Sequence, residues 1–310
     1  MVGDRGFSAR LRSLLSRLYR SKEPASPDIG PAPGGVPAAH MSSSSDSGCS
    51  SSANTPDGPA PFICVPLYIY PAPGAWGPLV RAARDRPEAR FHAIVNPRNG
   101  PGEGELPDEN YVKAVRELSA LPNVKVLGYV HVTYGRRDAQ EVRSDVDRFA
   151  AWRGHDECLK IDGIFFDEAP AEVGMMAYMA DASRHAKRSL KEANGRRGIV
   201  MLNPGVVVPR SYYDIADFVV AFEQAHRHWK ATRADFLEAI DYGMAAKTVV
   251  MVHSCRSGNR GLEELARGFK ERGIRGQYVT EQMEGGYSKW SSWWDRYVDF
   301  VFSDVVRESP

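Results

Sequence analysis

The chain has 310 residues, a formal net charge of +1 and 43% hydrophobic residues, which is an ordinary globular composition. This near-neutral charge argues against a nucleic-acid-binding protein, because such proteins usually carry a clear basic excess. No apolar stretch is long enough to cross a bilayer, so the sequence predicts no transmembrane segment.

The first 60 residues differ in composition from the rest. From Ser21 to Pro61 the chain is dominated by Ser, Pro, Gly and Ala, which bury too little apolar surface to offset their ordering entropy. We therefore predict a disordered extension over residues 1–60. Within it, leucines at helical spacing with arginines between them predict a short basic amphipathic helix over 7–20. This helix is compatible with a mitochondrial transit peptide, a weak contact with a membrane surface, or a loosely ordered tail.

No secretory signal is visible in this N-terminal part of the sequence. The expected location is therefore intracellular (cytoplasmic or mitochondrial), or outside the cell after non-classical export. Four widely spaced cysteines include no CxxC pair, so zinc or thioredoxin-type chemistry has no support. Cys64 and Cys255 lie in apolar runs and are predicted to be buried thiols, whereas Cys49 lies in a Ser-rich stretch and is predicted to be exposed.

From residue 61 onward, short apolar runs alternate with amphipathic stretches. The runs are rich in β-branched and aromatic residues and nearly continuous, as is typical of parallel strands covered on both faces. They cover 61–70, 90–97, 124–132, 161–168, 198–205, 217–223, 247–254 and 276–281. Helical patterns cover 108–121, 138–153, 171–194, 232–243, 261–273 and 291–306, whereas 74–86 and 211–216 are weaker connections.

This alternation predicts a fold of the α/β class. Each crossover returns the chain to the same edge of the sheet, which forces parallel pairing of successive strands. Eight such units over about 250 residues predict a closed (β/α)8 TIM barrel as one domain over residues 61–310. An open doubly wound sheet is the alternative, but no GxGxxG loop follows the first run.

Polar side chains gather at one end of the predicted strands. In a barrel of this kind the active site lies at the C-terminal ends of the strands. Polar residues replace apolar ones there in nearly every run, and the opposite ends show no comparable set. These strand-end residues are Tyr68, Tyr70, Asn96, His131, Tyr134, Asp167, Glu168, Asn203, Glu223, His253, Tyr278 and Glu281.

Two runs end in carboxylates. The segment IDGIFFDEAP ends in Asp167 and Glu168, and DFVVAFEQ leads through apolar residues to Glu223. An unpaired buried carboxylate is costly, so such groups are normally paired or functional. A pair of carboxylates suits glycosidic cleavage, in which one protonates the leaving oxygen and the other attacks or activates water. The alternative is structural, with Asp167 or Glu168 capping the next helix or pairing with an arginine.

Aromatic rings near the same strand ends favour a sugar ligand, because flat rings stack on the apolar faces of pyranoses. Trp76 follows the first strand closely enough to join them, whereas Trp293 and Trp294 are better explained by helix packing. The residues predicted to bind substrate are Tyr68, Tyr70, Trp76, Asn96, His131, Tyr134, Asn203, His253 and Tyr278.

Metal and cofactor chemistry has less support. His131, His253 and the carboxylates could hold a divalent metal, yet the first strand lacks the two histidines of a typical barrel metallohydrolase. No strand end carries a lysine for a Schiff base. The loop 254–261 resembles a Gly-rich anion cradle, although a plain turn explains it as well. We therefore predict neither a metal nor a cofactor.

Taken together, VPLYIYPAPGAWGPL, FHAIVNPRNGPG, VLGYVHVTYGRR, IDGIFFDEAP, LNPG and DFVVAFE resemble the spherulin-4 (spherulation-specific family 4) glycoside hydrolases. The resemblance runs from about Phe62 to the last helix. It implies a (β/α)8 barrel and an endo-acting hydrolase of α-1,4-linked galactosamine or N-acetylgalactosamine polymers, with a retaining mechanism. By this resemblance Asp167 is the nucleophile and Glu223 the general acid/base, while Glu168 tunes or positions them.

A second interpretation remains open. The chain could be a non-catalytic carbohydrate-binding barrel linked to the cell wall or to sporulation. Such a protein would keep the aromatic residues and lose the carboxylates, and the carboxylates are present here. In either case the expected partner is a polysaccharide or an oligosaccharide.

Overall fold

The structure is a computed structural model that describes residues 60–283 and 287–303. The predicted extension over 1–60, its amphipathic helix over 7–20 and the exposed Cys49 therefore fall outside the described residues, apart from residue 60. Within the described ranges, no helix is both long enough and apolar enough to cross a membrane.

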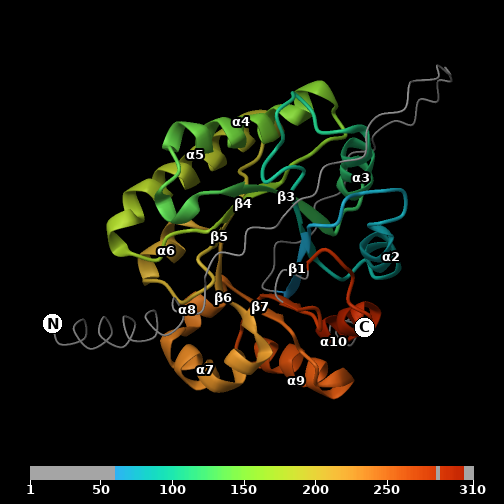
Figure 1. Cartoon of the computed structure of the whole chain (residues 1–310), viewed down its shortest axis with the longest axis vertical. Coiled ribbons are helices and arrows are strands. Elements are labelled where there is room, and N and C mark those ends of the chain that lie inside the picture. The colour runs from blue at the N-terminus through green and yellow to red at the C-terminus, as the bar shows by residue number, and fades with distance from the viewer. Residues whose placement is uncertain (1–59, 284–286, 304–310) are drawn as a thin grey trace. The chain divides into compact units, whose positions relative to one another are not determined.

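Eight parallel strands in the described residues close into a barrel in chain order, from β1 beside β2 around to β8 beside β1 (Figure 1). All eight predicted runs form strands, so the predicted barrel is confirmed. The strands are β1 Phe62–Leu67, β2 Phe91–Val95, β3 Val124–His131, β4 Gly163–Asp167, β5 Ile199–Asn203, β6 Phe218–Ala225, β7 Thr248–His253 and β8 Gly276–Val279.

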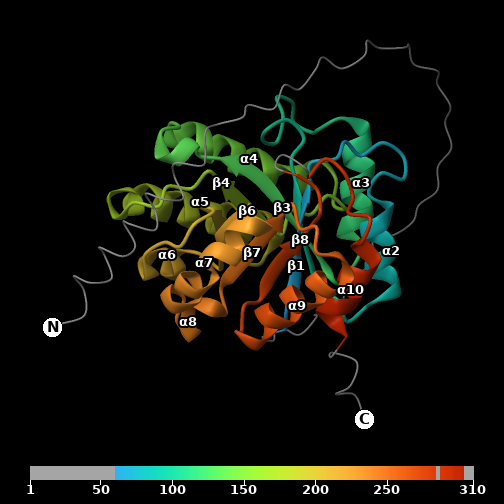
Figure 2. The ribbon, with the colours of Figure 1, turned by 60° about the horizontal axis from the view of Figure 1, so that its bottom comes forward.

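Helices cover the outside of the barrel (Figure 2). They are α2 Gly77–Asp85, α3 Glu109–Ser119, α4 Ala139–His155, α5 Met176–Asn194, α6 Arg210–Ile215, α7 His226–Ala239, α8 Tyr242–Ala245, α9 Gly258–Glu271 and α10 Trp294–Phe302. The two weaker connections, 74–86 and 211–216, form the helices α2 and α6.

The helix predicted over 232–243 is wrong at both ends. The structure begins α7 at His226 and ends it at Ala239, and a separate short helix, α8, follows. Trp229 and Phe236 explain the early start, because both are buried and their rings meet at 5.3 Å on one face of the helix. Asp241 then starts α8, since its side chain accepts a hydrogen bond from the backbone of Met244.

Aspartate caps fix where two of the longer helices begin. The Asp108 side chain accepts hydrogen bonds from the first-turn backbone of α3, and Asp138 does the same for α4. Helix α5 is capped at its C-terminal end by Gly195, which takes the left-handed conformation that glycine adopts without strain. These caps therefore define where α3 and α4 begin and where α5 ends.

The two apolar cysteines are buried, as predicted: Cys64 on β1 and Cys255 after β7 both carry free thiols. Burial raises the pKa of the Cys64 thiol, and the Glu223 charge adds to that effect. Burial likewise raises the pKa of Cys255. Both thiols are therefore neutral packing groups rather than nucleophiles.

Helix α4 packs on β3 through a glycine, and this contact gives a stability prediction. A Cβ added at Gly128 would meet the Phe149 ring at 2.7 Å, and Phe149 is itself fully buried. We expect Gly128→Ala to lower the free energy of unfolding by roughly 1–3 kcal/mol, as overpacking does. Urea unfolding measures the change.

The matched control is Gly154→Ala in the exposed part of α4, where nothing lies within 4 Å of the added Cβ. Alanine should stabilise this helix by about 0.5–1 kcal/mol relative to glycine. Equal effects of the two substitutions would show that the contact between Gly128 and Phe149 does not limit packing.

Candidate active site

The strand register brings three of the predicted residues side by side at the C-terminal end of the barrel. Asp167 at the end of β4 pairs with His131 on β3 and with Asn203 on β5. Glu223 lies on the next strand, β6. The barrel therefore gathers at one end residues that are far apart in the sequence, as expected for this fold.

The Asn203 amide bridges the two candidate catalytic carboxylates. Its Nδ2 donates to Asp167 Oδ1 at 2.7 Å and to Glu223 Oε2 at 2.6 Å. Both bonds share one nitrogen, so these two oxygens lie no farther apart than the sum of 2.7 and 2.6 Å. Asp167 and Glu223 can therefore flank a single bond.

Asp167 lies among donors that stabilise its negative charge. The Tyr129 hydroxyl donates to Oδ2 at 2.8 Å, and Oδ1 accepts from the Glu168 backbone at 2.9 Å as well as from Asn203. Hydrogen bonds to the charged form favour that form of a carboxylate. This environment suits a group that acts as an anion, such as a nucleophile.

Four tyrosine rings form a wall beside the carboxylates: Tyr68, Tyr129, Tyr278 and Tyr287. Tyr68 contacts Tyr129 edge to face at 5.7 Å and Tyr287 at 6.0 Å, and Tyr287 also contacts Tyr278 at 5.8 Å. Burial raises the pKa of Tyr68 and of Tyr129 well above the usual value, and the nearby carboxylate charges add to it. These phenols therefore stay neutral and keep their protons as donors.

Backbone strain gathers at the same end of the barrel. Among described residues, the non-glycine positions with positive φ all follow the ends of β2, β3, β4 and β7. They are Asn99, Thr133, Tyr134, Glu168 and Ser254. Such conformations persist only where the surroundings fix them, and they are concentrated at functional sites. For Glu168, with φ of 52°, the turn directs the chain away from β4 directly after Asp167.

Three residues predicted to bind substrate make contacts within the protein. Trp76 is 3% exposed, and its indole nitrogen donates to the backbone of Ile69 at 2.9 Å, so it packs within the protein and has no free face for a sugar. The Asn96 side chain closes the turn after β2 by accepting from Gly100 at 3.0 Å. Tyr70 is half exposed and hydrogen-bonds the residues at the start of α3.

Three other predicted residues lie on the rim. The His131 Nδ1 lies 3.1 Å from the backbone oxygen of Asn99, which joins the loops after β3 and β2. Tyr134 donates its backbone N–H to the Glu168 carbonyl at 2.7 Å. His253 is buried, and its Nδ1 lies 3.0 Å from the Ser254 hydroxyl.

A buried ion-pair cluster supports these loops. Asp145 on α4 pairs with Arg137 and with Arg148, each at 2.6 Å. Arg137 also donates to the His131 carbonyl at 3.1 Å, and Arg148 donates to the Gly102 carbonyl. One buried carboxylate thus ties the loops after β2 and β3 to the helix beneath them, which keeps the rim in place.

Sequence reasoning missed two residues of this site. Tyr129 lies inside β3, two residues before the strand end, where nothing in the sequence pattern marks its hydroxyl as part of a site. Tyr287 follows the last strand in a segment with no periodic pattern. Tyr278, which was predicted to bind sugar, is 3% exposed and packs between Tyr287 and Tyr297.

Glu281 anchors the segment that follows β8. Its Oε1 accepts from the Ser292 backbone at 2.7 Å and from the Ser292 hydroxyl at 2.9 Å, and its other oxygen accepts from Ser291. Burial alone would raise the pKa of this carboxyl, but the hydrogen bonds from Ser291 and Ser292 outweigh it and lower the pKa.

This lowered pKa predicts a pH-dependent stability difference between the wild type and Glu281→Gln. A carboxyl with a lowered folded-state pKa contributes stability above its unfolded value, about 4.3 for Glu, and loses it as the pH falls through the folded value. Urea unfolding should therefore show Glu281→Gln to be less stable at pH 7, by about 1 kcal/mol or less because the group is partly exposed. The difference should shrink as the pH is lowered through the folded-state pKa of Glu281, and a difference that is constant with pH would exclude this role.

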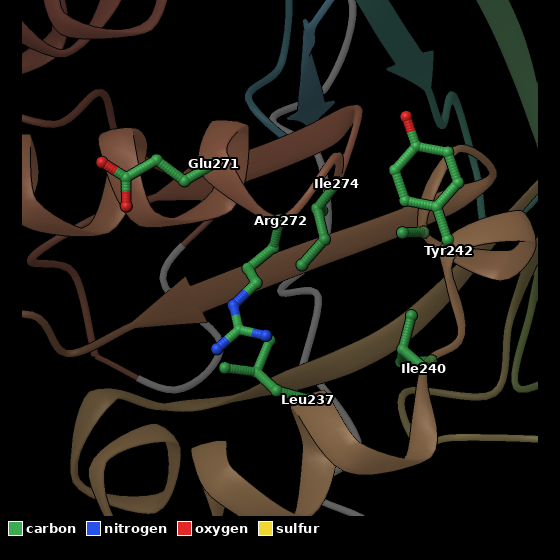
Figure 3. Close-up of a pocket in the computed structure, with 7 residues that line it drawn as sticks. Leu237, Ile240, Tyr242, Glu271, Arg272 and Ile274 are labelled. Carbon is green, nitrogen blue, oxygen red and sulfur yellow. The ribbon is translucent and has the colours of Figure 1, made fainter.

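A cavity of about 300 Å³ lies away from the carboxylates (Figure 3). Its lining comes from the segments that precede β7 and β8, at the N-terminal end of the barrel: Leu237, Ile240, Tyr242, Ala245, Glu271, Arg272 and Ile274. In the described residues, no cluster of three or more His, Cys, Asp or Glu side chains is arranged to hold a metal ion.

Comparison with known proteins places the chain in a family. The model of the spherulation-specific family 4 matches residues 62–301. Spherulin-4 of Physarum polycephalum is 31% identical over 202 residues, which cover 64% of this chain and 56% of that protein. The crystal structure of Aspergillus clavatus Sph3 in complex with GalNAc is 30% identical, with a TM-score of 0.71, over 79% of this chain and 98% of that one. The chain belongs to the spherulation-specific family 4.

Proposed function

We propose that this protein is a glycoside hydrolase that cleaves an amino-sugar polysaccharide. The substrate is an α-1,4-linked polymer of galactosamine or N-acetylgalactosamine, cut within the chain. The observation that carries the proposal is the pairing of Asp167 and Glu223 through the Asn203 amide. Two carboxylates so placed supply the acid and the nucleophile that glycosidic cleavage requires.

The spacing of the two acids favours a retaining mechanism. Retaining enzymes hold their carboxyl groups about 5–5.5 Å apart, whereas inverting enzymes leave about 6.5–9.5 Å for a water molecule. The two oxygens that share the Asn203 nitrogen, Asp167 Oδ1 and Glu223 Oε2, lie no farther apart than the sum of 2.7 and 2.6 Å, a bound that is compatible with the shorter class.

In this mechanism Asp167 is the nucleophile and Glu223 the general acid/base. Glu223 protonates the leaving glycosidic oxygen as Asp167 attacks the anomeric carbon and forms a glycosyl ester. Glu223 then removes a proton from water, which releases the sugar and frees Asp167. Glu168 adds negative charge next to Asp167, and its backbone N–H donates to the Asp167 carboxylate at 2.9 Å.

The amino-sugar assignment is supported by a relative. Aspergillus clavatus Sph3, which was crystallised in complex with GalNAc, shares the fold at a TM-score of 0.71 and 30% identity. Tyr68 and Tyr287, the two rings of the tyrosine wall that are only partly buried, suit such a ligand, because aromatic rings stack on the apolar face of a pyranose. A non-catalytic carbohydrate-binding barrel, the alternative, would have no use for two acids bridged at bond-cleaving distance.

The direct test incubates the purified chain with polymers of galactosamine, N-acetylgalactosamine and glucosamine and measures new reducing ends. The expected result is cleavage of a galactosamine-type polymer into oligosaccharides, with no change on addition of a chelator. Binding without reducing ends would favour the non-catalytic barrel. Activity that a chelator abolishes would favour a metal-dependent hydrolase.

A further inference from the structure

Tyr287 brings a third type of group to the carboxylate pair. Its ring contacts the partly buried Tyr68 at 6.0 Å and the buried Tyr278 at 5.8 Å, so these two neighbours hold the ring against the site. Its hydroxyl is shielded from solvent and has no hydrogen bond of standard geometry with the described residues. A buried hydroxyl without a partner destabilises the fold, so an acceptor is expected within reach.

The electrostatics of Tyr287 identify that acceptor. Burial raises the pKa of Tyr287 well above its usual value, and the charge of the nearby Glu223 carboxylate is the next largest cause. The phenol therefore remains protonated at any working pH and can only donate to an anion beside it. The Asp167 charge is a smaller cause, so Glu223 is the candidate acceptor.

Glu223 has an oxygen available for this donor. Asn203 donates to Oε2 at 2.6 Å, which leaves Oε1 to accept from another group. The other acid, Asp167, already accepts a hydrogen bond on each of its two oxygens. Asp167 takes the Asn203 amide on one oxygen and the Tyr129 hydroxyl on the other, at 2.7 and 2.8 Å.

We propose that Tyr287 is the positioning residue of Glu223, and that its hydroxyl donates to Glu223 Oε1 whenever that carboxylate is charged. The inference rests on the proposed function, in which Glu223 gives a proton to the leaving oxygen and later takes one from water. The negative charge on Glu223 appears at the moment of proton transfer. A donor aimed at the place where charge develops stabilises the transition state more than the ground state.

Tyr287→Phe tests the assignment, because it removes the hydroxyl and keeps the ring contacts with Tyr68 and Tyr278. We expect kcat to fall about 10- to 100-fold, with KM changed less than about threefold. The alkaline limb of the pH–rate profile should move to higher pH, because a carboxylate that loses a donor holds its proton more tightly. In a Glu223→Gln background the same substitution should cost nothing further, since Tyr287 acts through Glu223.

The matched control is Tyr213→Phe. It also removes a buried tyrosine hydroxyl, but one that lies 3.4 Å from Thr248 at the start of β7, at the opposite end of the barrel. Its kinetics should equal those of the wild type. If Tyr287→Phe does not fold, 3-fluorotyrosine at position 287 replaces it: the stronger donor should move the alkaline limb to lower pH. Wild-type kcat and pH profile in the position-287 variant would overturn the proposal.

A second measurement separates this proposal from the proposed function. Failure of the wild type to cleave any amino-sugar polymer would refute the function and leave Tyr287 to be judged by NMR. In a carbon-13 titration the midpoint of the Glu223 Cδ signal should rise in Tyr287→Phe and stay in place in Tyr213→Phe. An unmoved midpoint would overturn the Tyr287 assignment whether or not the chain hydrolyses sugar.

Discussion

Asp167→Asn and Glu223→Gln are each expected to lower kcat/KM for amino-sugar polymer hydrolysis by at least about 10³-fold, since a lost nucleophile or acid/base costs that much in related chemistry. Each replacement keeps the shape of the side chain and removes its charge. The double variant should be little worse than either single one, because the two residues act as a unit.

The thermal stability of Asp167→Asn and Glu223→Gln should stay equal or rise while their activity falls. The two carboxylates are held close together, and removing one charge relieves their repulsion. Thermal unfolding at pH 7 should therefore show a Tm equal to or above that of the wild type, as is common when an active-site strain is released. Glu264→Gln, an exposed carboxylate paired with Arg260 on α9, is the control and should change neither activity nor Tm. Hydrolysis retained in either active-site variant would remove that residue from the mechanism.

Asn203→Ala should have the second largest effect. The substitution removes the one nitrogen that both Asp167 and Glu223 accept from, so the acids lose their common donor and repel one another. Loss of a single charge-stabilising donor typically costs about 10²–10³ in kcat. We therefore expect kcat to fall by that factor, with a smaller change in KM, measured from initial rates of reducing-end release.

Asn110→Ala provides the comparison for this loss of an amide. Asn110 also donates through its side-chain nitrogen, but to the Tyr70 hydroxyl at 2.9 Å near the start of α3 rather than to either acid. It should retain the wild-type kcat. If Asn203→Ala kept the wild-type kcat as well, the carboxylates would have to be positioned without the bridge.

The barrel could be predicted because its signal is repeated along the chain. Eight apolar runs with helices between them admit few topologies, and parallel pairing places every strand end on the same side. Asp167 and Glu223 could then be placed near each other from their positions at the ends of their runs. The predicted proximity is confirmed by the shared Asn203 amide.

The contacts of single side chains could not be predicted in the same way. A strand-end position fixes where a residue lies along the chain, but not which way a loop turns its side chain. Trp76 follows β1 and still packs inward, where its indole nitrogen donates to the Ile69 carbonyl. Asn96 likewise closes its own turn, because its side-chain oxygen accepts from the backbone N–H of Gly100.

The residues that were missed lie where patterns carry no information. Tyr129 alternates with apolar neighbours inside a strand, and only the three-dimensional register turns its hydroxyl toward Asp167. Tyr287 lies beyond the last strand, and its contact with Tyr68 depends on closure of the barrel between β8 and β1. Such long-range contacts have no counterpart in local periodicity.

Azide rescue tests most directly whether Asp167 and Glu223 act on one bond in the proposed roles. Glu223→Ala and Asp167→Ala are each incubated with an activated α-galactosaminide and azide, and the anomer of the glycosyl azide is read by NMR. Azide should restore turnover in both, with the α-azide from Glu223→Ala, where the intermediate on Asp167 still forms, and the β-azide from Asp167→Ala, where azide attacks directly. Exchanged anomers would reverse the roles, and no rescue in either variant would contradict a retaining pair at this site.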